Sequence, residues 1–207
     1  MKSPILFICL ILNTCLLFAQ AQPVVSKKTD STASKSNKLN SSNLKLTDGS
    51  NMLPTNDVAT NIARCKELST FNKTINITGF TESFKCIGPI TVFVPNNQAF
   101  SNLSPDKLDS LLTPERKYDL IALVSYHVIA GKVTGRNITH KISSHKGLAT
   151  FITLAGSKLM AKLDENRNII LIDENGDKST ISRFNIKQSN GLVHITNSVL
   201  IPKFKNI

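Results

Sequence analysis

The chain has 207 residues, of which 41% are hydrophobic, and its 25 Lys and Arg against 14 Asp and Glu give a formal net charge of +11. This apolar fraction supports a folded core and excludes wholesale disorder. With 9 glycines and 8 prolines a collagen-like architecture is excluded, and no window reaches the ~20 apolar residues that a membrane span needs. The basic excess is distributed along the chain, which is typical of a solvated surface or, alternatively, of a protein with an anionic partner.

The first 21 residues have the pattern of a secretory signal peptide. Lys2 precedes an apolar run over 5–18, and Ala-Gln-Ala follows at 19–21. We expect cleavage after Ala21 and a secreted or extracytoplasmic protein, in the periplasm or at the cell surface. The four residues that end at Cys15 have the outline of a lipoprotein signal, but their central Asn and Thr argue against lipid anchoring there.

The remainder divides into a tether, one folded domain and a short tail. Residues 22–53 are rich in Ser, Thr, Asn and Lys and lack both aromatic residues and a sustained apolar period, which predicts a disordered tether. Residues 54–204 have the composition of a single folded domain, and 205–207 form the tail.

The first half of the domain shows helical signals. Val58, Ile62, Cys65 and Leu68 recur at a spacing of three to four residues, as on one helix face. Ser, Pro and Asp at 104–106 are typical of a helix start. Thr, Pro and Glu at 113–115 repeat that signal and predict a second helix over 117–125.

The second half of the domain shows strand signals. The expected strands are 91–94, 147–154, 158–163, 169–173, 179–186 and 191–202. Turn-forming residues at 164–166 and 174–177 predict hairpin tips. Helices followed by strands indicate an α+β domain rather than alternating βαβ units.

Three segments resemble the motifs of fasciclin domains, in the order that this family has. They are 91–100 (TVFVPNNQAF), 126–133 (YHVIAGKV) and 190–202 (NGLVHITNSVLIP). The resemblance covers about Asp57 to Lys203. It implies a fasciclin-type β-wedge of about seven strands flanked by several helices that lie mostly in the N-terminal half. It also implies an extracellular or periplasmic protein that works in adhesion and in protein or glycan binding, without a shared catalytic site.

The motif residues on which the resemblance depends are Thr91, Phe93, Pro95, Asn96, Phe100, Gly131, Asn190, Gly191, His194 and Pro202. Most of them can also be explained as determinants of the fold. The β-branched and aromatic run at 91–94 suits a central strand, and Asn96 or Asn97 can cap a short helix. Gly191 permits a tight turn into the last strand.

Tyr126 and His127 are the candidate binding residues, because the resemblance implies that this Tyr-His pair contributes to partner binding. The alternative is that the His127 imidazole is a buried hydrogen-bonding group. His140 and His145 fall in a predicted loop without a nearby carboxylate, which argues against a metal site.

Catalytic patterns are absent from the sequence. It contains neither a Gly-x-Ser-x-Gly elbow nor a His-Glu-x-x-His motif. The acids at 164–165, 173–174 and 177 lie at predicted hairpin tips, where acidic residues serve turns. We therefore expect no enzymatic activity, no metal and no cofactor.

Cys65 and Cys86 are the cysteines left after signal cleavage, an even pair in an exported chain. We predict a disulfide between them, worth roughly 3 kcal/mol by its effect on chain entropy. Two buried thiols are the alternative.

The resulting prediction is a secreted, non-enzymatic adhesion module that binds a cell-surface or matrix protein or a glycan. The alternative is a polyanion-binding or ligand-carrying extracellular module that uses its basic surface. Nucleic acid is excluded as a partner because the aromatic residues are chiefly phenylalanines in core-like positions and offer no stacking platform. The identity of the partner, the binding face and the oligomeric state stay open.

Overall fold

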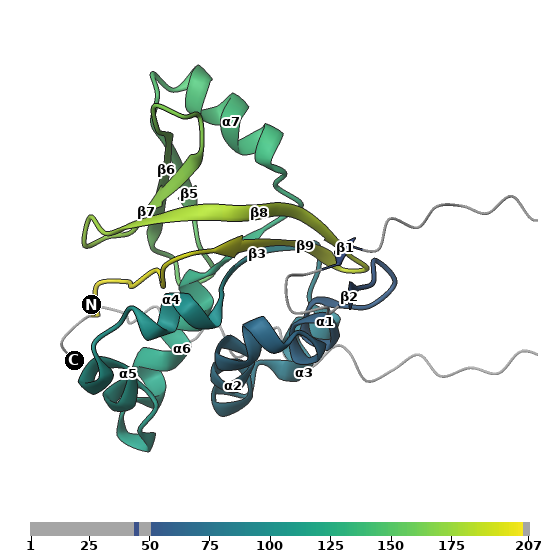
Figure 1. The fold of residues 1–207 in the computed structure, drawn as a ribbon, viewed down its shortest axis with the longest axis vertical. Helices are drawn as coiled ribbons and strands as arrows, with labels where there is room; N and C mark the ends of the chain where they lie inside the picture. The colour runs from purple at the N-terminus through teal and green to yellow at the C-terminus, as the bar shows by residue number, and fades with distance from the viewer. Residues whose placement is uncertain (1–43, 46–50, 205–207) are drawn as a thin grey trace, which may run out of the picture. The chain divides into compact units, whose positions relative to one another are not determined.

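A computed structural model describes residues 44–45 and 51–204 of the chain (Figure 1). The predicted signal peptide, most of the tether and the tail therefore lie outside the described residues. The elements, in chain order, are β1 (Leu44–Lys45), β2 (Asn51–Met52), α1 (Val58–Arg64), η2 (Lys66–Leu68), α2 (Ser69–Thr78), α3 (Thr81–Cys86), β3 (Ile90–Pro95), α4 (Asn97–Ser101), α5 (Pro105–Leu111), η3 (Pro114–Arg116), α6 (Lys117–Tyr126), β4 (Val128–Ala130), α7 (Gly135–Ser144), β5 (Ala149–Ile152), β6 (Lys158–Leu163), β7 (Ile169–Ile172), β8 (Lys178–Gln188) and β9 (Gly191–Thr196).

The main sheet has seven strands in the order β4-β3-β9-β8-β7-β6-β5. β3 and β9 run parallel, and the other neighbours are antiparallel. A bridge between Ile129 and Thr153 connects the two outermost strands, so the sheet is nearly closed into a barrel. The predicted α+β class with about seven strands is confirmed, as are the hairpin tips on either side of β7.

The core consists of two clusters of buried side chains. The first lies between helices α1–α6 and strands β3 and β9, and Phe71, Val92 and Val193 belong to it. The second lies between α7 and strands β5–β7, where Ile138 and Ile142 of α7 pack against the inner face of the sheet. In Figure 1, α7 accordingly covers one side of β5–β7, and the remaining helices gather at the other end of the domain.

Gly191 is required for a reason other than the predicted tight turn. It is the first residue of β9 and pairs with Ile90 in the parallel β3–β9 ladder. A Cβ atom at this position would lie 2.1 Å from the Ile90 carbonyl oxygen. The close approach of two backbones therefore excludes every side chain here.

Two predicted elements differ from the structure. The loop expected around His140 is helix α7, which begins at an unusual capping box made by Thr134 and Asn137 instead of an acidic residue. The last strand, predicted to continue to residue 202, ends at Thr196. Beyond it, the Asn197 side chain accepts the Thr180 N–H of β8, and the Ser198 backbone N–H donates to the Ser179 hydroxyl.

The N-terminal boundary of the folded region also needs correction. Met52 is 2% exposed and belongs to the first core cluster, and β2 pairs with β1. The folded part therefore begins before residue 54. The first predicted helix is shorter than expected, because Cys65 has extended backbone angles that separate α1 from η2.

The predicted disulfide between Cys65 and Cys86 is wrong, since the structure contains no such bond. The two side chains have different surroundings. Cys65 is 2% exposed within the first core cluster, whereas Cys86 is exposed at the last residue of α3.

Candidate binding surface

Tyr126 and His127 lie inside the domain, at the junction of α6 and β4. Both side chains are 0% exposed. The Tyr126 hydroxyl donates a 2.8 Å hydrogen bond to the Lys158 carbonyl at the start of β6, and burial raises the pKa of its phenol. In this arrangement neither side chain can reach a partner, and the placement favours the alternative in which they are buried hydrogen-bonding groups.

The hydrogen bonds of His127 fix its protonation state. Nδ1 lies 2.8 Å from the Leu123 carbonyl, which can only accept, and Nε2 accepts the Leu200 backbone N–H at 3.1 Å. The ring is therefore neutral with its proton on Nδ1. Its ring also contacts Phe71 at 5.5 Å between centroids, and burial lowers the pKa of His127 to about 4.

His194 of β9 has the opposite tautomer. Its Nε2 donates to the Val133 carbonyl at 2.8 Å, and Nδ1 accepts the Asn185 N–H at 3.3 Å. The ring stacks on Phe93 with centroids 5.4 Å apart. Burial lowers the pKa of His194 to about 4. Neither imidazole is placed to act as a base on a bound molecule.

The other motif residues connect separate segments of the backbone. The Thr91 hydroxyl donates to the Gly131 carbonyl at 2.6 Å and accepts the Val133 N–H at 2.8 Å. The Asn190 side chain accepts the Val58 N–H at 3.0 Å and donates to the Phe84 carbonyl at 2.7 Å. These side chains hold loops and helices to the β3–β9 pair.

The remaining motif residues have local structural roles. Pro95 ends β3, and the Asn96 side chain caps α4 by accepting the Ala99 N–H at 2.8 Å. Phe93, Phe100 and Pro202 are buried, and Gly131 has a positive φ of 85°. Among the described residues, every buried side-chain N or O atom has a hydrogen-bond partner. No unused polar group marks a catalytic centre in this part of the chain.

Metal and membrane sites find no support in the described part of the chain. His140 is exposed on α7 and His145 lies at its C-terminal end. Among residues 44–45 and 51–204, no cluster of three or more His, Cys, Asp or Glu side chains could hold a metal ion. The described helices are also too short or too polar to cross a bilayer.

One surface open to contact is the side of β5–β8 that faces away from α7. We name it the outer sheet face. The side chains of its residues lie on the same face of the sheet. These residues are Thr150, Ile152, Lys158, Met160, Lys162, Ile170, Ile172, Lys178 and Thr180. The residues that alternate with them, such as Leu159 and Leu171, belong to the core under α7.

The outer sheet face has an apolar centre with a lysine rim. Met160 pairs with Ile172 across β6 and β7. Lys158 and Lys162 lie two residues to either side of Met160 on β6, and Lys178 of β8 pairs directly with Ile172. Ile152 remains 59% exposed at one side. Among the described helices, α7 alone has an extensive contact with β5–β7, and it lies on the opposite side.

A shallow hollow of about 480 Å³ lies where this face meets the β6–β7 hairpin tip. Lys162, Lys178 and Ile170 line it from the face, and Asp164 and Glu165 line it from the tip. Asp164 is engaged with Asn168 through bonds of 2.7 and 2.9 Å, and this contact lowers the pKa of its carboxyl.

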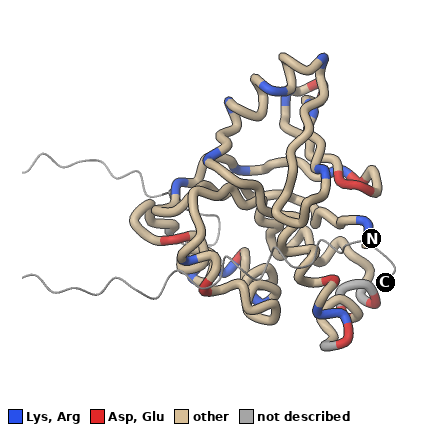
Figure 2. Tube along the Cα trace, turned by 180° about the vertical axis from the view of Figure 1, so that it is seen from behind, with Lys and Arg blue, Asp and Glu red and all other residues tan. Residues whose placement is uncertain are grey.

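The segment that precedes the β6–β7 hairpin tip carries basic residues without acidic ones. Between Asp119 and Asp164 the sequence has no acidic residue, and its cations are Lys132, Arg136, Lys141, Lys146, Lys158 and Lys162. Figure 2 shows these cations along α7 and the neighbouring strands, with the acidic hairpin tip beside them. We expected the basic excess to be spread along the chain without forming a block. That expectation missed this segment, because it followed the positions of the cations and not the absence of acidic residues between them.

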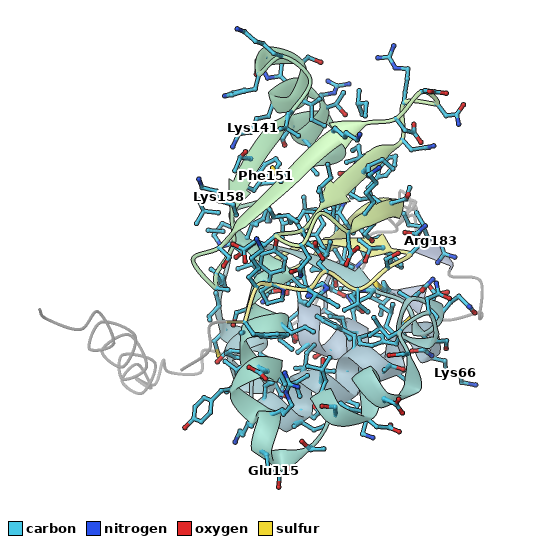
Figure 3. All side chains as sticks on the ribbon, turned by 90° about the vertical axis from the view of Figure 1, so that its left-hand side faces the viewer. Lys66, Glu115, Lys141, Phe151, Lys158 and Arg183 are labelled. Carbon is cyan, nitrogen blue, oxygen red and sulfur yellow. The ribbon has the colours of Figure 1, made fainter. Side chains whose placement is uncertain are left out.

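Lys141 shows how α7 is attached to the edge of the sheet. Its ammonium lies 4.4 Å from the Phe151 ring centroid and donates to the Thr150 carbonyl at 2.6 Å (Figure 3). A lysine so placed also occupies a carbonyl on the edge strand β5, which would otherwise be open to pairing.

The fold has a close counterpart among solved structures. The described domain matches a FAS1 domain pair from the insect cell adhesion molecule fasciclin I with a TM-score of 0.62, at 18% identity, over 74% of this chain and 52% of that one. At this identity the match defines the class of fold, a helix-flanked β-wedge.

The sequence comparisons define the family. Residues 66–202 match the Fasciclin domain family, so the chain belongs to it. It is 29% identical over 134 residues to Protein sll1483 of Synechocystis, covering 65% of this chain and 67% of that protein. It is 30% identical to the immunogenic protein MPB70 of Mycobacterium bovis, over 56% of this chain and 51% of that protein. The match to mouse Stabilin-2 is 30% identical over 55% of this chain and spans 4% of that protein.

Proposed function

We propose that this protein is a secreted, non-enzymatic binding module that attaches to a cell-surface or matrix macromolecule, protein or glycan, through its outer sheet face. The observation that carries the proposal is the partly exposed apolar centre of Met160 and Ile172 within a rim of three lysines. An apolar centre with a polar rim is the usual anatomy of a protein interface.

The charge of this face defines the partner. The rim residues Lys158, Lys162 and Lys178 are all cationic, and the face itself contributes no carboxylate. We therefore expect an acidic partner surface, because complementary charge steers encounter and suppresses wrong partners. Family membership and the structural likeness to a cell adhesion molecule support an adhesive role.

A second candidate function is binding of a flexible polyanion. The acid-free segment between Asp119 and Asp164 supports it, since its cations lie on α7 as well as on the sheet. Such binding would use charge alone and would depend strongly on salt. It would involve Arg136 and Lys146 of the α7 region as much as the lysines of the outer sheet face.

The two functions can be separated by binding the full chain to arrayed glycans and matrix proteins across salt concentrations. An adhesive face predicts retention that persists in ~0.5 M salt and is lost in Met160→Ser/Ile172→Thr. Polyanion binding predicts that retention collapses in salt and is lost in Arg136→Gln/Lys146→Gln. Retention that neither pair of substitutions changes would contradict both functions.

The non-enzymatic part of the proposal has its own test. The buried polar side chains of the family motifs are engaged within the fold, as described above for His127, His194 and Thr91. We expect no turnover of model esters or glycosides by the full chain. Turnover that survives repeated purification would refute this part of the proposal.

A further inference from the structure

A second surface feature lies away from the outer sheet face, between the three N-terminal helices. Each helix contributes two polar side chains four residues apart, and they are Thr60 and Arg64 of α1, Asn72 and Asn76 of α2, and Thr81 and Lys85 of α3. Residues at this spacing lie on the same side of a helix, so all three helices turn a polar pair toward a common space. We name this space the helix pocket, and its volume is about 300 Å³.

Two alanines keep the helix pocket open. Ala59 and Ala63 of α1, again four residues apart, also line it. Ala59 is 4% exposed and belongs to the core, whereas Ala63 is exposed toward the pocket. A larger side chain at residue 63 would fill the space without entering the core. The volume is at the lower end of the ~300–1,000 Å³ that is typical of ligand sites.

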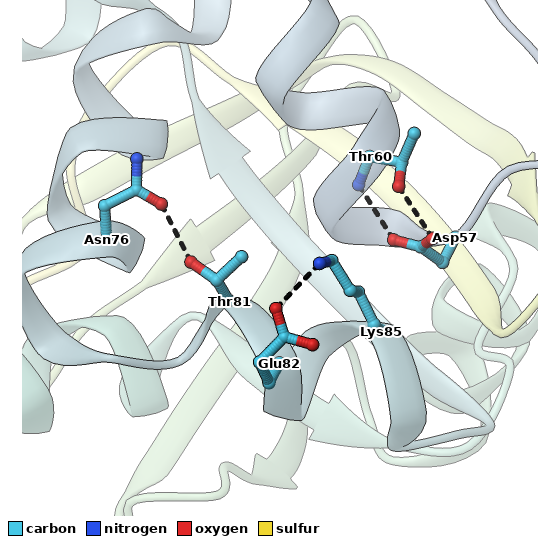
Figure 4. Close-up of polar contacts among 6 residues, drawn as sticks. All are labelled: Asp57, Thr60, Asn76, Thr81, Glu82 and Lys85. Carbon is cyan, nitrogen blue, oxygen red and sulfur yellow. Dashed lines mark hydrogen bonds and ion pairs between the residues drawn. The ribbon is translucent and has the colours of Figure 1, made fainter.

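Hydrogen bonds within the wall fix the orientation of its polar groups (Figure 4). The Thr81 hydroxyl donates to Asn76 Oδ1 at 2.8 Å, which leaves the Asn76 amide N–H groups for other acceptors. The Thr60 hydroxyl donates to Asp57 at 2.7 Å, and its oxygen keeps acceptor capacity. These contacts hold the lining groups in place before any ligand arrives.

The two cations of the pocket differ in their partners. Lys85 is paired with Glu82 at 2.7 Å, and this hydrogen bond raises the pKa of Lys85. Arg64 takes part in none of the three ion pairs found among the described residues. The guanidinium of Arg64 is thus the charge in the lining that an incoming anion can engage, and it presents a planar fork suited to a carboxylate.

The lining therefore combines amides and hydroxyls with one available guanidinium. Amides and hydroxyls are matched by a ligand that carries several hydroxyl groups, because both can donate and accept. A phosphate would need more cationic groups than the lining offers, since Lys85 is already paired. We infer that the helix pocket binds a single sugar residue with a carboxylate, its hydroxyls on Asn72, Asn76 and Thr81 and its carboxylate on Arg64.

The inference goes beyond the outer sheet face and does not depend on it. We would titrate the full chain with glucuronate and with glucose, which lacks the carboxylate, and follow backbone amide NMR signals. The expected result is saturable shifts in α1–α3, with glucuronate binding at least about tenfold more tightly than glucose, as a charge-assisted pair to arginine provides. Equal binding of the two sugars, or shifts outside α1–α3, would overturn the inference.

Matched variants complete the test. Arg64→Gln should reduce glucuronate affinity about tenfold and leave glucose binding unchanged. Ala63→Phe should abolish binding of both sugars by filling the pocket, while Lys73→Gln, which removes an exposed charge of α2 outside the lining, should change neither. Unfolding curves confirm that each variant folds. Unaltered glucuronate binding by Ala63→Phe would refute the inference, and that result would leave the outer sheet face untouched.

Discussion

The buried motif residues and the outer sheet face use their polar groups in opposite ways. In the interior, the polar side-chain atoms of His127, His194 and Thr91 bond to backbone groups, and each residue reaches at least one separate segment of the chain. On the outer sheet face, Lys158 of β6 and Lys178 of β8 lie on either side of β7, beside partly exposed apolar side chains. The residues that identify the family therefore build the scaffold, and the residues available to a partner lie on strands that the motifs do not include.

This difference predicts which substitutions alter binding and which alter folding. Changes to the interior should lower stability, and loss of binding should follow only from unfolding. Changes to the outer sheet face should alter binding at constant stability. The predictions below test that division from the largest expected effect to the smallest.

Acid should destabilise the interior most. His127 and His194 have pKa values lowered to about 4, below their value of 6.5 in the unfolded chain. Between pH 4 and pH 6.5 the unfolded state therefore binds more protons than the folded state. As a result, the free energy of unfolding falls as the pH is lowered through this range. Each histidine should contribute up to about 3 kcal/mol to this loss, measured by urea unfolding at a series of pH values. A control variant, His140→Gln on exposed α7, should show the same acid dependence as the wild type. Stability that is constant from pH 7 to 5 would contradict the buried, neutral assignment.

Gly191→Ala should cost about 3 kcal/mol, because its Cβ would lie 2.1 Å from the Ile90 carbonyl oxygen in a packed β-ladder. Gly156→Ala is the matched control. That glycine has a φ of 75° in an open turn with no heavy atom within 4 Å of the added Cβ, so about 1 kcal/mol of backbone strain is expected. Denaturant midpoints of the two variants measure the difference. Equal losses would show that the close approach of β3 and β9 is not the reason for this glycine.

Tyr126→Phe should cost about 1 kcal/mol, because it removes the hydrogen bond to the Lys158 carbonyl and keeps the ring in place. Thermal or urea unfolding measures the loss. Binding to any partner should be unchanged, since the hydroxyl is buried. A folded Tyr126→Phe variant with lost binding would instead support direct contact by the Tyr-His pair.

Sequence alone predicted the architecture because its signals were local. Turn-forming residues at 164–166 placed the end of β6, and the proline-led starts preceded α5 and α6. Helix α7 was missed because its first turn contains glycine and no acid, and its cap depends on Asn137. All six residues of β9 are buried at the centre of the sheet, so this strand shows no alternation of buried and exposed residues.

The site was less predictable than the fold. The outer sheet face depends on the register among β5–β8, which brings three lysines from two strands around Met160 and Ile172. Register between strands is a tertiary property that the residues of one strand do not specify. The helix pocket likewise requires three helices to meet. Only the spacing of four residues within each helix is visible in the sequence.

The most direct test of the division between scaffold and surface compares two variants in one binding assay. Lys158→Gln/Lys162→Gln/Lys178→Gln removes the rim of the outer sheet face, and Tyr126→Phe alters the buried motif. We expect both variants to fold, the triple variant within about 0.5 kcal/mol of the wild type because its substitutions are at the surface. On arrayed glycans and matrix proteins at low salt, the triple variant should be retained more weakly than the wild type, because its rim charges no longer steer the partner, and Tyr126→Phe should be retained as strongly as the wild type. Wild-type retention of the triple variant together with loss in Tyr126→Phe would contradict the account.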